Sequence, residues 1–226
     1  MAKASGSLIA ESRGEILGRI RRALLNKVGF ESSQSAGVAT PGAPGTTEPS
    51  FAKRGSGPVD RLMEVLLDYK ATVSVTEPAR LSKVLAEVVE SQGIKSVVIP
   101  QGLNRDWCRK IRGIDIIIDD GKLSIAELST IDGVITGCSC AIAETGTLVL
   151  SGLADEGRRA ITLLPDFHFC VVRSSTILRS VGELFTRIEV SRPVTLISGP
   201  SATSDIELRR VEGVHGPRNL FVVIVS

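Results

Sequence analysis

The chain has 226 residues, of which 42% are hydrophobic, enough to bury one sizeable core. Lysine and arginine number 27 against 25 aspartate and glutamate residues, so the chain lacks the strong basic excess typical of nucleic-acid-binding proteins. No apolar run reaches the roughly 18 to 20 residues that span a bilayer, and the N-terminus lacks a signal-peptide core; we therefore expect a cytoplasmic protein without a membrane span.

The first segments have the composition of a helix followed by a linker. Apolar residues recur at helical spacing over 8–28, and the other face is basic, which predicts an amphipathic helix within residues 1–30. Such a helix packs or contacts a partner more often than it binds a membrane surface. Residues 31–57 are rich in Ser, Gly, Ala, Thr and Pro, which predicts a flexible linker before a folded domain over 58–226.

Helices and strands alternate from residue 58 onward. In chain order we expect a helix over 58–69, a strand over 71–76, a helix over 78–92, a strand over 96–99, a weak helix around Trp107 and a strand over 114–118. This alternation predicts parallel strands with helical crossovers, a sheet covered on both faces and binding sites at strand ends.

The C-terminal half is richer in strands. Short apolar runs predict strands over 133–137, 147–150, 160–164, 169–172, 194–197 and 220–225, with one helix over 181–188. The predicted fold is therefore an α/β fold with an open, mostly parallel sheet, helices on both faces and a strand-rich C-terminal section.

Four cysteines are present, and only Cys138 and Cys140 are close together. On one strand face these two thiols would form a metal pair or a redox couple, and otherwise they are small buried side chains. The four-cysteine runs typical of iron-sulfur clusters are missing. We therefore expect no metal site and no cofactor in this chain.

Glu144 stands at a turn between two apolar stretches, followed by Thr145 and Gly146. Apolar neighbours would desolvate this carboxylate and suit it to acid/base or nucleophilic work, and Gly146 would let a ligand approach the backbone. The alternative is that Glu144 only accepts backbone N–H bonds within a tight turn. Glu144 is thus the candidate catalytic residue, with Thr145 and Gly146 as substrate contacts.

The segment 198–207 places a glycine and several hydroxyl groups directly after a strand. Such a loop can turn amides and hydroxyls toward an anion, and its candidate ligand-binding residues are Gly199, Ser201, Thr203 and Asp205. The alternative is an ordinary cap of a helix start.

His215, held between two glycines, is a further candidate. Arg158 and Arg159 precede an apolar run and can bind a carboxylate, at least one of them is expected to be a solvated charge, and Arg158 is the candidate for anion binding. His168 is expected to be a structural histidine, with Asp166 as a possible partner. A small anionic ligand is therefore expected.

Four strings, A-E-T-G-T-L-V-L-S-G, R-R-A-I-T-L-L-P-D-F-H-F-C-V-V, I-S-G-P-S-A-T-S-D-I-E and G-V-H-G-P-R-N-L, resemble the lactate-utilisation (LUD) domain in order and spacing. The resemblance covers about residues 58–226 and best fits the lactate-utilisation protein C family. It implies a fold similar to CoA transferases and sugar-phosphate isomerases. It also implies a role beside iron-sulfur partner proteins in oxidising L-lactate to pyruvate. Glu144-Thr145-Gly146 resembles the Glu-x-Gly turn of CoA transferases.

Three functions remain open. The first is an accessory or small-carboxylate-binding subunit of lactate oxidation, because flavin, nicotinamide and cluster signatures are missing from the sequence. The second is an enzyme that acts on a CoA ester or a phosphorylated small molecule through Glu144. The third is a scaffold whose basic N-terminal helix recruits an acidic partner.

Overall fold

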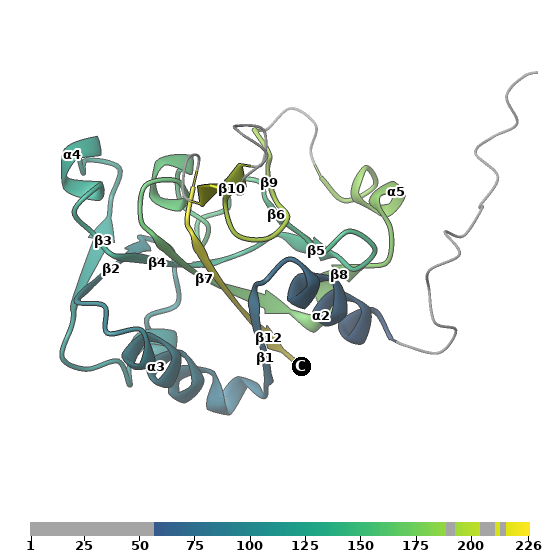
Figure 1. The fold of residues 1–226 in the computed structure, drawn as a ribbon, viewed down its shortest axis with the longest axis horizontal. Helices are drawn as coiled ribbons and strands as arrows, with labels where there is room; N and C mark the ends of the chain where they lie inside the picture. The colour runs from purple at the N-terminus through teal and green to yellow at the C-terminus, as the bar shows by residue number, and fades with distance from the viewer. Residues whose placement is uncertain (1–56, 189–192, 204–210, 213–215) are drawn as a thin grey trace, which may run out of the picture. The chain divides into compact units, whose positions relative to one another are not determined.

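The computed structural model describes residues 57–188, 193–203, 211–212 and 216–226, drawn in colour in Figure 1. The helix predicted within residues 1–30 and the linker preceding residue 57 lie outside the described residues. Asp205 and His215 also lie outside them.

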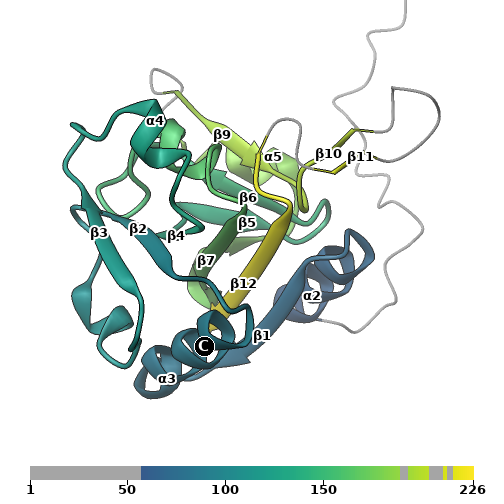
Figure 2. The same ribbon diagram turned by 60° about the vertical axis from the view of Figure 1, so that its left-hand side comes forward.

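The main sheet has six strands, in the order β1-β12-β7-β4-β2-β3. The strands are β1 (Thr72–Thr76), β2 (Ser96–Pro100), β3 (Asp115–Asp119), β4 (Gly133–Gly137), β7 (Phe167–Arg173) and β12 (Asn219–Val225). Every neighbouring pair is parallel. The predicted α/β fold with a mostly parallel sheet is confirmed, and Figure 2 shows the strands lying side by side.

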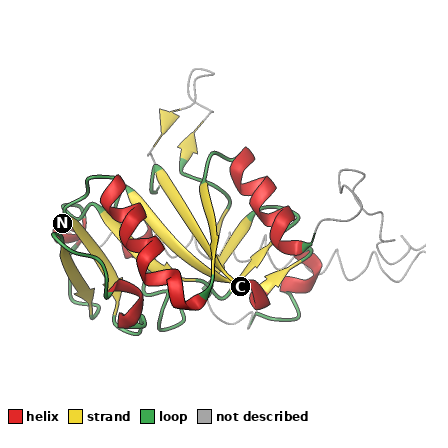
Figure 3. Cartoon of the chain, turned by 90° about the horizontal axis from the view of Figure 1, so that it is seen from below, coloured by secondary structure: helices red, strands yellow, loops and turns green. Residues whose placement is uncertain are grey.

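Successive side chains along each strand point to opposite faces of the sheet, and each face has its own cover. Phe169 and Phe221 pack on one face with Leu85 of α3 (Leu81–Ser91) and with η2 (Arg105–Cys108). The 3₁₀ turn η1 (Pro78–Arg80) directly precedes α3. Cys170 and Val222 pack on the other face with α2 (Pro58–Asp68). Helices therefore cover both faces, and Figure 3 shows the strands fanning between the two longest of them.

A second sheet lies on the α2 side and accounts for much of the strand-rich C-terminal section. It has the order β8-β5-β6-β9. Its strands are β5 (Cys140–Ile142), β6 (Thr147–Leu150), β8 (Ile177–Leu178) and β9 (Thr195–Ile197). Ala141 and Leu148 pack into the same cluster as α2 and the main sheet. A two-stranded ribbon, β10 (Ala202–Thr203) and β11 (Val211–Glu212), follows.

Two local predictions differ from the structure, and some short elements were not predicted. The strand predicted over 160–164 is wrong: this apolar run forms the 3₁₀ helix η3 (Arg159–Thr162), and it resembles a strand because Ile161 and Thr162 are both buried. The helix predicted over 181–188 is shorter in the structure, where α5 spans Val181–Leu184. The 3₁₀ turn η4 (Ser174–Thr176) precedes it in the chain. The short helix α4 (Ile125–Leu128) was not predicted, although Ser124 and Glu127 form a capping box at its start.

Candidate functional site

The predicted turn around Glu144 joins β5 to β6 in the second sheet. Its backbone is held in place, because the N–H of Glu144 donates to the carbonyl of Arg179 at 3.1 Å. Gly146 has a φ of +59°, and a Cβ there would lie 2.7 Å from Cγ1 of Val65 in α2. The helix α2 therefore occupies the space beside Gly146 that the sequence analysis assigned to a ligand.

A chain of hydroxyl groups links this turn to the loop after β9. Oγ1 of Thr145 lies 2.7 Å from Oγ1 of Thr147, which lies 2.8 Å from Oγ of Ser198. The two segments meet because β6 and β9 pair antiparallel, with Leu148 opposite Ile197. Two segments that are about fifty residues apart in the sequence are thus neighbours in the fold.

A pocket of about 310 Å³ opens beside this loop, between η3 and the first residues of β7 and β12. Its polar and glycine lining is Arg159, Thr162, His168, Thr195, Ser198, Gly199, Ser201 and Gly216. Its apolar lining is Leu163, Leu196, Ile197, Pro200, Pro217 and Leu220. Ligand sites typically combine such an apolar wall with a few converging polar groups, and this volume is at the small end of their range.

Two of the loops that the sequence analysis selected form adjoining walls of this pocket. The N–H of Ser201 donates to the carbonyl of Pro217 at 2.8 Å, which joins the loop after β9 to the segment before β12. Gly199 has a φ of +84°, and a Cβ there would lie 2.7 Å from Cβ of Tyr69. Of the other residues predicted for these loops, Thr203 falls in β10.

His168 lies in the pocket wall and is 1% exposed. Its Nε2 lies 2.8 Å from Oγ1 of Thr136 on β4, while its Nδ1 is buried without a hydrogen-bond partner among the described residues. Burial lowers the pKa of His168 to about 4, so the imidazole is neutral at neutral pH. Asp166, considered above as a partner of His168, instead pairs with the guanidinium of Arg218.

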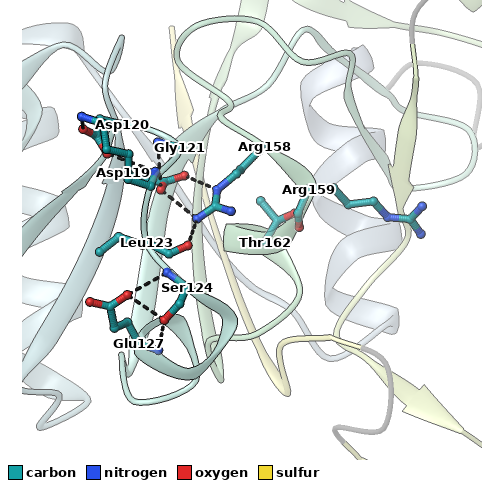
Figure 4. A network of polar contacts seen from close by, with 10 residues as sticks. Asp119, Asp120, Gly121, Leu123, Ser124, Glu127, Arg158, Arg159 and Thr162 are labelled. Atoms are coloured by element: carbon teal, nitrogen blue, oxygen red, sulfur yellow. Dashed lines mark hydrogen bonds and ion pairs between the residues drawn. The ribbon is translucent and has the colours of Figure 1, made fainter.

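Arg158 and Arg159 point in opposite directions (Figure 4). Nε and Nη2 of Arg158 bind the two carboxylate oxygens of Asp119 at 2.8 and 3.0 Å, and Asp119 is 6% exposed. Arg159 lines the pocket, and the hydroxyl of Thr162 donates to its carbonyl at 3.0 Å. Arg158 was the residue predicted to bind an anion, whereas Arg159 is the one that lines the pocket.

Glu156 is a buried acid that the sequence analysis did not select. Its carboxylate accepts hydrogen bonds from Oγ of Ser139 at 2.5 Å and from the N–H groups of Ser151 and Leu153 at 2.7 and 2.8 Å. These three donors satisfy a group that is 0% exposed, so Glu156 holds the loop after β6 in place.

The four cysteines are free thiols, and all are buried. Cys138 packs with the main sheet and Cys140 packs with β6 and α5, so the two do not share one face. A hydrogen bond with Cys170, together with burial, raises the pKa of Cys138, and burial raises the pKa of Cys108 to about 11. Within the described residues, no group of three or more His, Cys, Asp or Glu side chains is arranged to hold a metal ion.

The residues that line the pocket include one arginine, several residues with hydroxyl groups and a neutral histidine. A guanidinium binds a carboxylate through two parallel hydrogen bonds, and hydroxyl groups complete such a site. The arrangement is therefore suited to holding a small carboxylate.

None of the helices in the described part of the chain combines the length and hydrophobicity of a membrane span.

Comparison with known proteins points to one family. The family model described as LUD domain matches residues 59–225. The chain is 46% identical over 165 residues to "Lactate utilization protein C" of Deinococcus radiodurans, a match that covers 71% of this chain and 76% of that protein. It is 27% identical over 212 residues to the protein of the same name from Shouchella clausii, covering 85% of this chain and 90% of that one.

A solved structure is also similar. It is the crystal structure of a DUF162 family protein from Deinococcus radiodurans, with a TM-score of 0.63 and 37% sequence identity. The superposition covers 75% of this chain and 96% of that chain.

Proposed function

The chain belongs to the LUD domain family, and we propose that it serves lactate utilisation by binding a small carboxylate in the pocket beside Arg159. In this proposal it is an accessory subunit for the oxidation of L-lactate to pyruvate, and iron-sulfur partner proteins carry the electrons. The names of its relatives in Deinococcus and Shouchella support the lactate role.

The observation that carries the carboxylate proposal is the position of Arg159. Arg159 belongs to the pocket lining, and none of the ion pairs between described residues involves it. Its neighbour Arg158 is already bound to Asp119. Arg159 is therefore the cation left to meet the carboxylate of L-lactate or pyruvate.

The remaining lining fits a substrate of three carbons. Ser198 and Ser201 belong to the pocket lining, and their hydroxyl groups can bond the 2-hydroxyl of lactate or the 2-oxo group of pyruvate. Leu163 and Leu220 supply apolar surface for the methyl group. His168 is neutral, so it adds no second positive charge.

The assignment of electron transfer to partner proteins is supported by the cysteines. The chain has four, all four are buried, and the sequence contains no ferredoxin-type run. This division of work agrees with what the family resemblance implies.

Deleting the gene and measuring growth on L-lactate as the sole carbon source tests the proposal. We expect growth to fail and to return with the wild-type gene, but not with Arg159→Gln. Arg80→Gln, which removes an exposed arginine outside the pocket, is the matched control and should restore growth. Normal growth of the deletion strain, in a host without a paralogue, would refute the proposal.

A further inference from the structure

A second pocket, of about 480 Å³, lies at the far ends of β7 and β12, opposite the ends that line the pocket beside Arg159. Pro78 follows β1, Arg173 ends β7 and Val225 ends β12, so this pocket is at the carboxyl edge of the parallel sheet. Ligands of open α/β sheets bind at this edge. Arg173 lies five positions after His168 along β7, or roughly 16 Å at the rise of a strand, so the two pockets are distinct.

Ser82 contributes a polar group that the folded chain leaves unused. It lies in the first turn of α3 and in the lining of this pocket, and it is 5% exposed. Its hydroxyl has no hydrogen-bond partner among the described residues. A buried hydroxyl without a partner destabilises a fold, and the hydrogen-bonding capacity of Ser82 is therefore available to a ligand of this pocket.

The charged lining is mainly positive. Arg109 and Arg173 line the pocket together with a single acid, Asp106. Arg173 is held in place from two sides: Nη2 lies 3.3 Å from Oδ2 of Asp155, and its guanidinium carbon lies 5.8 Å from the ring centroid of Trp107. A cation fixed in this way loses little side-chain entropy when it binds a ligand.

The remaining lining suits the carbon skeleton of a ligand. Ala79, Leu81, Val171 and Val225 supply apolar surface. The 3₁₀ turn η1 and the helix α3 that follows it begin at this pocket. The positive end of a helix dipole lies at its N-terminus and favours an anion there.

From these observations we infer that the pocket at the carboxyl edge binds a small phosphorylated molecule. The phosphate lies between Arg109 and Arg173 and accepts a hydrogen bond from the hydroxyl of Ser82. The carbon skeleton lies on the apolar wall. Arg109 is in none of the ion pairs between described residues, and Arg173 shares its charge with Asp155, so the two guanidinium groups together suit the doubly charged phosphate monoester better than a monocarboxylate. This site does not depend on the lactate role or on the pocket beside Arg159.

The chain contains one tryptophan, Trp107, which lines this pocket, so its fluorescence reports on this site alone. We would titrate the full chain with glycerol phosphate, and with glycerol and L-lactate at matched ionic strength. A saturable change with glycerol phosphate only is expected. The absence of any saturable change, or an equal response to L-lactate, would overturn the inference.

Variants locate the contact. Arg109→Gln should weaken the binding of glycerol phosphate about tenfold or more, as expected for the loss of a charge-assisted hydrogen bond. Lys110→Gln removes the same charge one residue along the chain, outside the pocket lining, and should leave the affinity unchanged. Equal losses in both variants would show a general charge effect and contradict the proposed site.

Ser82→Ala separates binding from folding. Because the hydroxyl has no partner in the fold, its removal should leave the free energy of unfolding unchanged or raised, while the affinity for glycerol phosphate falls about threefold or more. An unchanged affinity would contradict the contact assigned to Ser82. Arg159→Gln should bind glycerol phosphate with the affinity of the wild type. A failure of the phosphate site is therefore separable from a failure of the lactate proposal.

Discussion

His168 on β7 and Thr136 on β4 are joined by a hydrogen bond of 2.8 Å between Nε2 and Oγ1. The two strands are neighbours in the main sheet, and both side chains are buried on the face that carries the second sheet. This bond fixes the orientation of the imidazole at the wall of the Arg159 pocket. The neutral ring thus belongs to the core and to the pocket at the same time.

Acid should destabilise the fold through His168. Its pKa in the folded chain, about 4, lies below the ordinary value of 6.5, so the unfolded chain takes up a proton first as the pH falls. The stabilisation is complete above pH 6.5 and is lost toward pH 4. We expect the free energy of unfolding in urea to fall by about 2 kcal/mol between pH 6.5 and pH 5 because of this residue. His168→Gln should lack that decrease, and an identical decrease in the variant would contradict this origin.

The two neighbouring arginines should differ in their effect on stability. Arg158→Gln leaves the buried carboxylate of Asp119 without its bidentate partner and should lower the free energy of unfolding by about 2 kcal/mol. Arg159→Gln should change it by less than about 0.5 kcal/mol. Urea unfolding at neutral pH measures both. Equal losses would show that Arg159, too, has a structural role.

Gly146 should not tolerate a side chain. Alanine there requires a strained positive φ, and its Cβ would lie 2.7 Å from Val65. We expect a loss of about 3 kcal/mol, the sum of backbone strain and overpacking. Gly93 has a φ of +63° with nothing within 4 Å of a built Cβ, so Gly93→Ala should cost only about 1 kcal/mol. Thermal and urea unfolding of the two variants compare them, and similar losses would argue against the contact with α2.

Glu144→Gln tests the alternative that the chain is an enzyme acting through this residue. The carboxylate is not part of the lining of the Arg159 pocket, so pyruvate affinity should stay within about twofold of the wild type. Thermal-shift measurements with pyruvate, L-lactate, CoA and sugar phosphates provide the readout. A ligand that stabilises the wild type and loses its effect in this variant would favour the enzyme.

Much of the main sheet could be predicted from the sequence. The strands β2, β3, β4 and β12 are short apolar runs, and the alternation with helices indicated their parallel arrangement. The 160–164 run was misassigned because a short apolar run with buried Ile161 has the composition of a strand, and periodicity cannot separate a strand from a helical turn at this length. The strands β5 and β8 have three and two residues, too short to show a period.

The pocket was only partly predictable. Glycines and hydroxyls after β9 indicated one wall, because such residues are typical of ligand-binding loops. The choice between Arg158 and Arg159 depends on Asp119, which lies 39 residues earlier and is brought close only by the fold. His168 was expected to be structural, and its place in the wall follows from pairing between β7 and its neighbours.

Titration calorimetry of pyruvate with the full-length wild type, Arg159→Gln and Arg80→Gln decides whether Arg159 holds the carboxylate. We expect saturable binding to the wild type and to Arg80→Gln, with a loss of about tenfold or more in Arg159→Gln. Equal affinity of Arg159→Gln and the wild type would contradict it.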